Sequence, residues 1–194
     1  IASIELNVPG EHNVLNAMAA FVTASYLGVD VQTIISTLKE YSGANRRFDY
    51  IGTTEKGVRV IDDYAHHPTE IKATLAAARN VRHNKLWLIF QPHTYTRTKA
   101  LFSEFVDAFT DADVVIITDI YAAREKDVYN ISSYKLVTEM KAKHPDRPVY
   151  YVKDFEDIVR YIEKFAGKDD IVMTMGAGDV YKVGDMLLHK KEDL

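Results

Sequence analysis

Residues 62–71 read DDYAHHPTEI and combine groups that could serve as acids, bases, metal ligands or helix caps. A metal site needs histidine and carboxylate donors that converge on one point. His66 and His67 are adjacent, and adjacent side chains point apart in an extended segment, so their spacing argues against metal binding. Pro68 and Glu70 are typical of a helix start, where proline fits the first turn and an acid faces the positive helix end. Capping does not account for Asp62, Asp63, Tyr64 and His66.

A second polar segment, QPHTYTRT at residues 91–98, directly follows the apolar run LWLIF. We expect it to form a strand-to-helix loop that carries His93, Tyr95 and Arg97. The guanidinium group of an arginine can bind a carboxylate or a phosphate through two parallel hydrogen bonds. Free amide groups at the start of the following helix would bind the same anion. The alternative is a solvated loop with Arg97 at its surface.

Two further segments carry signals for nucleotide binding. GEHNVLNAMAA at residues 10–20 places Asn13 and Asn16 three residues apart, and so on one face of a predicted helix. Asparagine caps helix starts but disfavours helix interiors, so a structural role explains both residues poorly. Their amide groups match the donors and acceptors of an adenine edge. Arg46 and Arg47 follow later, where a guanidinium group could reach across a cleft between domains.

The segment GAGD at residues 176–179 is part of a G-x-G-x-x-G-like dinucleotide pattern, but Tyr181 stands at the third glycine position. Gly176 and Gly178 could therefore serve only to turn the backbone tightly. No G-x-x-x-x-G-K-[ST] phosphate loop occurs in the sequence. If the protein uses ATP, its main phosphate-binding loop lies elsewhere.

Hydrophobic periodicity predicts the elements that must position these segments. After residue 46, strands alternate with amphipathic helices, which predicts an α/β fold with a β-hairpin and a largely parallel sheet covered on both faces. Strands are expected at residues 48–54, 58–61, 86–90, 114–118, 149–152 and 171–175, and helices at 68–81, 99–109, 133–143, 155–165 and 180–189. Such sheets bind ligands at the carboxyl ends of their strands. We therefore expect the polar segments, with TDIYAARE after the fourth strand, to line one edge.

Residues 1–44 form a different unit. Helices are predicted at residues 11–27 and 31–41, preceded by a short strand. This is too little to bury a core of its own, so we interpret residues 1–44 as the end of an upstream domain and residues 45–194 as a C-terminal domain. The chain also starts at Ile1 without an initiator methionine, which indicates a cut through a longer protein.

Composition narrows the classes of function. With 194 residues and 47% hydrophobic content, the chain can bury the core of a full domain. A formal charge of -4, with acidic and basic residues interspersed, leaves no basic stripe for a nucleic-acid backbone. The absence of cysteine removes disulfides and zinc-thiolate sites and suits a cytoplasmic protein. No apolar run approaches the roughly 20 residues of a membrane span, so we expect no membrane insertion.

Four motifs occur together and in this order: G-x-H-N-x-x-N-A-x-A-A at residues 10–20, G-x-x-R-R-F at 43–48, D-D-Y-x-H-H-P-T-E at 62–70 and F-Q-P-H-x-Y-T-R-T at 90–98. On these motifs the chain closely resembles the Mur ligases over nearly its whole length. The first two motifs and Asp63 are general to that family, whereas Y-x-H-H-P and F-Q-P-H suggest its alanine-adding members. The ligase that recycles murein tripeptide is similar enough in these motifs to remain an alternative.

The resemblance implies a three-domain enzyme of peptidoglycan synthesis, with a UDP-sugar domain, a central ATPase domain and a Rossmann-like C-terminal domain. This chain would hold the end of the central domain and all of the C-terminal one. In the family, ATP phosphorylates the carboxylate of UDP-N-acetylmuramate, the amine of L-alanine attacks the acyl phosphate, and phosphate leaves. The Mg²⁺ ligands would lie in the upstream part, and none is expected here.

The resemblance also implies an ATP-binding set in this chain. By motif, His12, Asn13 and Asn16 would hold the adenine region, Asp63 the ribose and Arg47 the phosphates. Positive charge placed beside a phosphoryl group stabilises the developing negative charge of the transition state. Arg47 is therefore also a candidate for catalysis.

On the amino-acid side, the resemblance implies that Arg97 binds the carboxylate of alanine and that His66 contributes to catalysis. Many relatives have a second arginine directly after the histidine of F-Q-P-H, where this sequence has Thr94. A clamp of two arginines therefore cannot be assumed, and more of the binding falls to Arg97. The substrate-binding set is Tyr64, His66, His93, Arg97 and Gly176.

The phosphate loop of the family, its Mg²⁺-binding groups and its modified lysine are missing from this sequence. We therefore expect the chain alone to have no ligase activity. Two functions of other classes remain open. A nucleotide-dependent oxidoreductase would use GAGD as its dinucleotide loop, although that loop follows the last strand instead of the first. A non-catalytic nucleotide-binding module is the second, and the sequence leaves the oligomeric state undetermined.

Overall fold

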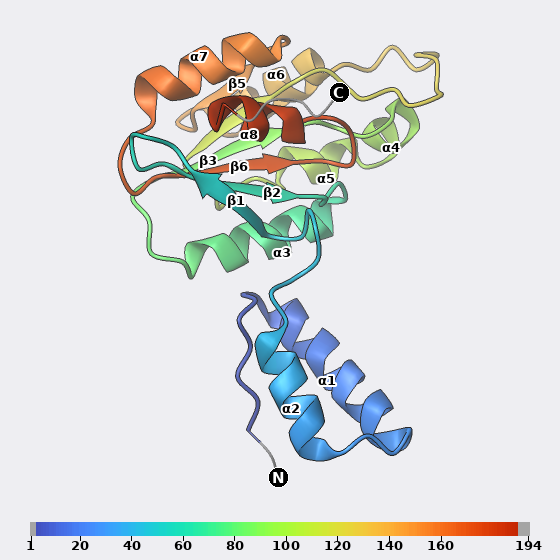
Figure 1. Ribbon diagram of the computed structural model, residues 1–194. Coiled ribbons are helices and arrows are strands. Elements are labelled where there is room, and N and C mark those ends of the chain that lie inside the picture. The colour runs from blue at the N-terminus through green and yellow to red at the C-terminus, as the bar shows by residue number, and fades with distance from the viewer. Residues whose placement is uncertain (1–2, 190–194) are drawn as a thin grey trace.

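A six-stranded sheet lies at the centre of the structure, a computed structural model that describes residues 3–189 (Figure 1). The strands are β1 (Asp49–Thr53), β2 (Arg59–Asp63), β3 (Leu86–Phe90), β4 (Val114–Ile117), β5 (Val149–Tyr151) and β6 (Ile171–Met175). Their order in the sheet is β1-β2-β6-β3-β4-β5. β1 is antiparallel to β2, and the other neighbouring strands are parallel. The predicted hairpin and the largely parallel α/β sheet are thus confirmed.

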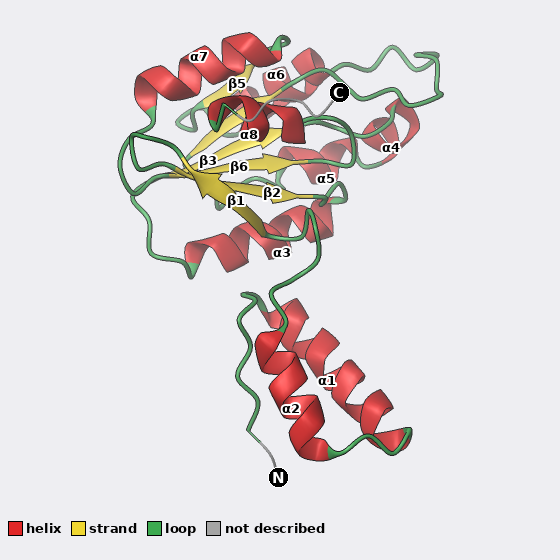
Figure 2. Cartoon of the chain, in the orientation of Figure 1, coloured by secondary structure: helices red, strands yellow, loops and turns green. Residues whose placement is uncertain are grey.

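Helices cover both faces of this sheet, and Figure 2 shows the strands as a layer between them. The helices of this part are α3 (Pro68–Arg79), α4 (Tyr95–Ala100), α5 (Phe102–Val106), α6 (Ser133–Lys143), α7 (Phe155–Phe165) and α8 (Tyr181–Leu187). α3, α5 and α6 pack on one face and α7 and α8 on the other, so each face has its own apolar core.

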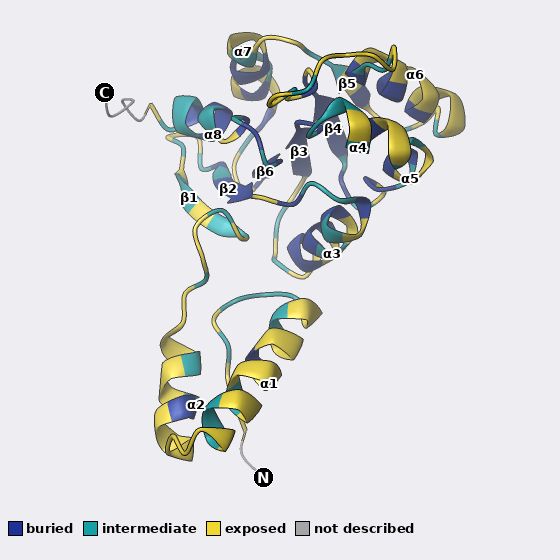
Figure 3. Cartoon of the chain, turned by 90° about the vertical axis from the view of Figure 1, so that its right-hand side faces the viewer, coloured by how far each residue is buried: buried dark blue, intermediate teal, exposed yellow. Residues whose placement is uncertain are grey.

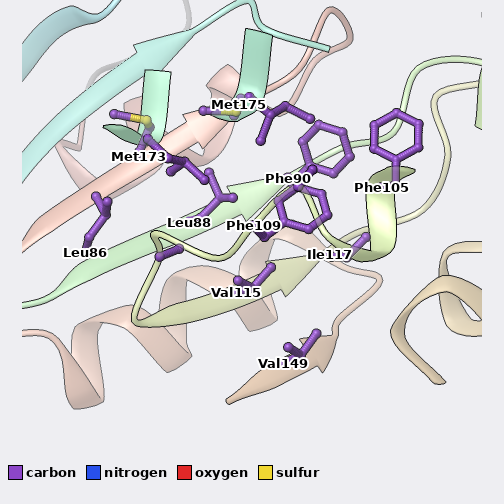
Figure 4. Close-up of a cluster of buried hydrophobic side chains, with 14 of the residues drawn as sticks. Leu86, Leu88, Phe90, Phe105, Phe109, Val115, Ile117, Val149, Met173 and Met175 are labelled. Atoms are coloured by element: carbon purple, nitrogen blue, oxygen red, sulfur yellow. The ribbon is translucent and has the colours of Figure 1, made fainter. Parts of the chain in front are cut away.

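The run LWLIF supplies both cores because successive side chains of a strand point to opposite faces. Leu86, Leu88 and Phe90 belong to the core under α3, α5 and α6, while Trp87 and Ile89 belong to the core under α7 and α8. Figure 4 shows the ring of Phe90 grouped with those of Phe105 and Phe109, and the ring centroids lie 5.7 and 5.0 Å from that of Phe90. A buried strand of this kind holds the loop after it in a fixed position.

The predicted helix at residues 99–109 is wrong in its bounds. The structure has two short helices there, α4 and α5, and α4 already begins at Tyr95. Threonine and tyrosine are poor helix formers, so TYTRT did not predict a helix. Tertiary contacts decide otherwise, since the distant Glu125 carboxylate accepts a hydrogen bond from the amide of Thr96 at 2.9 Å. Arg97 is consequently a helical residue and not part of a loop.

The helices α1 (Glu11–Tyr26) and α2 (Val31–Glu40) form a hairpin that stands apart from the sheet (Figure 1). Figure 3 shows both helices largely exposed, in contrast to α3 and the strands. Large apolar side chains of α1 remain uncovered, with Leu15 62% exposed and Val22 64% exposed. This fits a segment that packs against further protein, and the domain boundary near residue 44 stays a prediction.

None of the helices within residues 3–189 is long and apolar enough to cross a membrane.

Candidate active site

Polar loops meet at the carboxyl end of the sheet. Because β2, β6 and β3 are neighbours, the segments at residues 64–68, 176–180 and 91–97 that follow them lie side by side. The amide of Gly176 donates a hydrogen bond of 3.0 Å to the carbonyl oxygen of Asp63, which ties the first two segments together. The predicted convergence of polar loops at one edge is therefore present.

Asp63 is the last residue of β2 and is buried, with 4% of its surface exposed. Its Oδ1 accepts a hydrogen bond from the amide of Ala65 at 2.7 Å, and its Oδ2 accepts one from the amide of Phe48 at 2.8 Å. Burial raises the pKa of Asp63, although the two amides and the charge of Arg47 act in the opposite direction. The carboxylate thus links the segment before β1 to the loop after β2. Its expected contact with a ribose stays a prediction.

The end of the DDYAHHPTEI segment forms a helix cap, as predicted. Nδ1 of His67 accepts a hydrogen bond from the amide of Thr69 at 3.3 Å, and Oε2 of Glu70 accepts one from the amide of His67 at 3.2 Å. This reciprocal pair is a capping box. Burial alone would raise the pKa of Glu70, but hydrogen bonds from the His66 and His67 amides, with nearby positive charge, lower it. These residues are accounted for by the start of α3.

The imidazole ring of His66 contacts the backbone two residues earlier in the chain. Its Nδ1 lies 2.9 Å from the carbonyl oxygen of Tyr64, which can only accept a hydrogen bond. When the ring is neutral, this contact places its proton on Nδ1 and leaves Nε2 as an acceptor. The ring of His66 lies 5.5 Å from that of Tyr64 and 5.9 Å from that of His93. Three of the predicted substrate-binding residues are therefore close together.

Arg97 completes this group from the first turn of α4. Its Nη1 lies 3.1 Å from Nδ1 of His93, four residues earlier. On its other side, the ring of His93 is stacked with that of Tyr121 at 5.7 Å and an angle of 15°. Burial, then the charges of Arg97 and His66, lower the pKa of His93. A neutral imidazole whose Nδ1 carries no proton can accept a hydrogen bond from Nη1 of Arg97.

Replacing Arg97 with glutamine should raise the pKa of His93, because the substitution removes a positive charge that opposes protonation. In the wild-type chain that pKa lies below the ordinary value of 6.5, so the unfolded chain takes up the proton first. His93 therefore favours folding above pH 6.5, and this contribution is lost as the pH falls through the folded-state pKa. An NMR titration of the His93 ring measures the change, with Lys99→Gln as a charge-matched control. A pKa that stays the same in Arg97→Gln would contradict the assignment.

The two linker arginines differ in their surroundings. Arg46 Nε donates to Oδ2 of the buried Asp62 at 2.7 Å, so its guanidinium group is engaged within the protein. Arg47 is exposed, and its guanidinium carbon lies 5.6 Å from the ring centroid of Tyr64. The sequence did not distinguish the two. In the structure, Arg47 is the one that presents its charge to solvent beside Tyr64.

The GAGD loop packs closely against Gln91, a residue that sequence reasoning did not select. Oε1 of Gln91 accepts hydrogen bonds from the amides of Asp179 and Val180 at 2.9 and 3.2 Å, and its Nε2 donates to Oδ1 of Asp179 at 2.9 Å. Gly176, with φ at 148°, lies against the carbonyl oxygen of Gln91. The role of Gly176 in substrate binding stays a prediction, while its conformation serves the turn after β6.

A side chain at position 178 should destabilise this loop. A Cβ atom on Gly178 would clash with Oε1 of Gln91 and lie 2.7 Å from Cγ of Tyr121. We expect Gly178→Ala to lower the free energy of unfolding by about 2 kcal/mol, the usual size of such overpacking. Urea unfolding measures the change. Gly167→Ala is the matched control, because a Cβ there meets no atom within 4 Å. Equal stability of the two variants would refute the tight packing.

Asn13 and Asn16 line a pocket of about 280 Å³ between α1, α2 and the N-terminal segment. Asn13 also donates a hydrogen bond from Nδ2 to the carbonyl oxygen of Pro9 at 2.7 Å. The structure thus places both amides on one cavity, as their spacing predicted. His12 is exposed and does not line this pocket. Adenine binding by the three residues stays a prediction.

Tyr121 and Glu125 are further residues that sequence reasoning did not single out. Both belong to the segment after β4, which had been expected only to reach the same edge. The amide of Tyr121 donates to the carbonyl oxygen of Pro92 at 2.9 Å, and Glu125 binds the start of α4. Neither partner could be read from the sequence, since the contacts join segments about 30 residues apart.

Within residues 3–189, no three histidine, aspartate or glutamate side chains are grouped so that they could hold a metal ion.

Comparison with known proteins identifies the family. Residues 46–178 match the family model described as "Mur ligase, glutamate ligase domain", and this match spans more than half of the chain. The chain belongs to the Mur ligase family.

Named Mur ligases are similar over nearly all of the chain. It is 50% identical over 192 residues to UDP-N-acetylmuramate–L-alanine ligase of Acetivibrio thermocellus, covering 99% of this chain and 40% of that protein. It is 51% identical over 191 residues to the enzyme of the same name from Alkaliphilus metalliredigens, covering 98% and 41%. The chain therefore spans about 40% of the length of these Mur ligases.

Solved structures of Mur ligases share the fold. A crystal structure of UDP-N-acetylmuramate-alanine ligase from Thermotoga maritima is 29% identical with a TM-score of 0.81, covering 98% of this chain and 40% of that one. A murein peptide ligase from Psychrobacter arcticus is 25% identical with a TM-score of 0.71, covering 98% and 39%. Both relatives expected from the motifs thus have the same arrangement as this chain.

Proposed function

We propose that this chain is the C-terminal part of an ATP-dependent ligase that joins L-alanine to UDP-N-acetylmuramate in peptidoglycan synthesis. The observation that carries the proposal is the grouping of Tyr64, His66, His93 and Arg97 at one edge of the sheet, beside the exposed Arg47. Of these residues, Tyr64, His66 and His93 belong to the motifs that suggest the alanine-adding members. The sequence identity of about 50% to two proteins named UDP-N-acetylmuramate–L-alanine ligase supports the proposal.

Arg97 would bind the carboxylate of alanine. Its guanidinium group belongs to α4, and its Nη1 contacts the ring nitrogen of His93 at 3.1 Å and the carbonyl oxygen of His93 at 3.5 Å. An arginine fork can hold a carboxylate through two hydrogen bonds while its remaining donors keep such a contact. Thr94 cannot add a second cation, so this one charge would carry most of the recognition.

His66 would take a proton from the ammonium group of alanine. In the neutral ring, the hydrogen bond of Nδ1 to the Tyr64 carbonyl leaves Nε2 as the proton acceptor. An amine must lose its proton before it attacks the acyl phosphate formed with ATP. The rings of Tyr64 and His93 flank this imidazole and would position the amine.

Arg47 would act on the phosphate side. Its exposed guanidinium group lies beside Tyr64, so one ring separates the proposed phosphate contact from the residues proposed to bind alanine. ATP supplies the phosphoryl group that activates the carboxylate, and Asn13 and Asn16 would hold its adenine in the pocket along α1. Mg²⁺ ligands would come from other parts of the enzyme. The enzyme would act in the cytoplasm, which suits a chain without cysteine.

The murein tripeptide-recycling reaction is the alternative that a specific observation favours, since a murein peptide ligase shares the fold over 98% of the chain.

An oxidoreductase is disfavoured by the GAGD loop. Gln91 and Tyr121 pack directly on Gly178, in the space where a pyrophosphate would have to approach the backbone.

The test is a phosphate-release assay with the intact ligase, ATP, Mg²⁺ and UDP-N-acetylmuramate. We expect L-alanine to stimulate release and the murein tripeptide to have little effect. Stimulation by the tripeptide alone would move the assignment to the recycling ligase, and stimulation by neither would refute it. The 194-residue chain by itself should release no phosphate, because it lacks a phosphate loop.

A further inference from the structure

The side chain of Arg46 is bound on three sides at the carboxyl end of the sheet. Nε donates to Oδ2 of Asp62 at 2.7 Å, Nη2 to the carbonyl oxygen of Gly176 at 2.7 Å, and Nη1 to the carbonyl oxygen of Gly178 at 3.3 Å. One guanidinium group therefore connects three segments of the chain: the linker between α2 and β1, the end of β2 and the loop after β6. Figure 1 shows where these segments lie in the fold.

Two aromatic rings and a buried carboxylate enclose this group. The guanidinium carbon lies 5.0 Å from the ring centroid of Tyr64 and 4.8 Å from that of Tyr181. The side chain of Asp62 is 3% exposed, and its Oδ1 accepts a hydrogen bond of 2.6 Å from Oγ1 of Thr174. Each carboxylate oxygen of Asp62 thus has a partner, as a buried charge requires. A lysine could supply the charge but not the planar fork that reaches three acceptors.

The backbone of the linker is fixed on both sides of Arg47. Arg46 has φ at 58° and Phe48 has φ at 50°, values that non-glycine residues keep only where the surroundings impose them. The carbonyl oxygen of Arg46 accepts from the amide of Tyr64 at 2.6 Å, and the amide of Phe48 donates to Asp63. Arg47 therefore lies between two residues, Arg46 and Phe48, that are hydrogen-bonded to Tyr64 and Asp63 at the end of β2.

We propose that Arg46 is a positioning residue for the ligase reaction: it fixes the linker and Tyr64, and thereby sets where the Arg47 guanidinium group meets the phosphate. This inference rests on the proposed function. Arg46 acts through the protein, because Nε, Nη1 and Nη2 each donate a hydrogen bond to a protein acceptor, namely Asp62, Gly178 and Gly176. Loss of its fork should mainly slow the chemical step, since small displacements of a reacting group reduce rates strongly.

The experiment compares four forms of the intact ligase: wild type, Arg46→Lys, the double variant Arg46→Gln/Asp62→Asn, and Arg160→Lys as a control on the exposed side of α7. The double variant removes both charges together, so no buried charge is left unpaired and the fold is kept. For each form, kcat and KM for ATP and L-alanine are measured. Hydrogen exchange is followed at the amides of Phe48 and Tyr64.

In both Arg46 variants we expect kcat to fall roughly 100-fold, with KM values changed only a few-fold, and exchange at Phe48 and Tyr64 to become faster. The control should match wild type in every measurement. A folded double variant with wild-type kcat would overturn the inference, and so would unchanged exchange in both variants. If wild type itself releases no phosphate, the proposed function fails, and the exchange measurement alone decides whether Arg46 fixes the linker.

Discussion

Arg47→Ala in the intact ligase is expected to lower L-alanine-dependent phosphate release by roughly 1000-fold or more, the range found for arginines that stabilise phosphoryl transfer. The physical reason is its free positive charge. Arg47 is exposed and makes a cation–π contact with Tyr64, whereas Arg46 is bound within the protein. Charge that is already in place when the phosphoryl group becomes more negative stabilises the transition state without reorganisation.

The stability of Arg47→Ala should be close to that of wild type, because the side chain is exposed and the contact with Tyr64 contributes about 0.5–1 kcal/mol at such a site. Thermal unfolding of both forms separates lost chemistry from lost structure. Arg160→Ala serves as a control that removes an exposed arginine of α7. Phosphate release within a few-fold of wild type in Arg47→Ala would contradict its assignment to the phosphates.

Asp63→Ala is expected to abolish phosphate release and also to destabilise the chain. Its carboxylate accepts hydrogen bonds from the amides of Phe48 and Ala65, and its removal leaves a buried and a partly buried amide without this acceptor. Hydrogen bonds to charged groups contribute about 1.5–3 kcal/mol each, but burial of this carboxylate is itself unfavourable and raises its pKa. We therefore expect a net loss of about 3 kcal/mol in the free energy of unfolding.

Urea unfolding of the chain and the phosphate assay of the intact ligase measure these two effects. Asp63→Asn should fall between wild type and Asp63→Ala in stability, because one amide oxygen still accepts while the NH₂ group faces a donor. Asp146→Ala, which removes an exposed carboxylate, should change the unfolding free energy by less than about 0.5 kcal/mol. If Asp63→Ala were as stable as this control, the claim that the Asp63 carboxylate holds the linker against β2 would be wrong.

The alternation of strands and helices was predictable because each strand is a short apolar run and each helix has one apolar face. The five-residue run LWLIF is buried on both faces, so its composition alone indicated a central strand. The bounds of α4 were not predictable. TYTRT becomes helical because Glu125, from another loop, binds the amide of Thr96, and no local preference encodes that contact.

The sequence by itself determined the family motifs, the helix start at His67 to Glu70, and the edge of the sheet at which the polar loops gather, since periodicity, capping and strand direction are local properties. Tertiary structure decided which of two adjacent arginines is held inside. Arg46 and Arg47 have the same chemistry, and only the positions of Asp62 and two distant glycine carbonyls separate them. It also decided that Asp63 binds backbone amides, because those amides approach its carboxylate only after the linker has folded against β2.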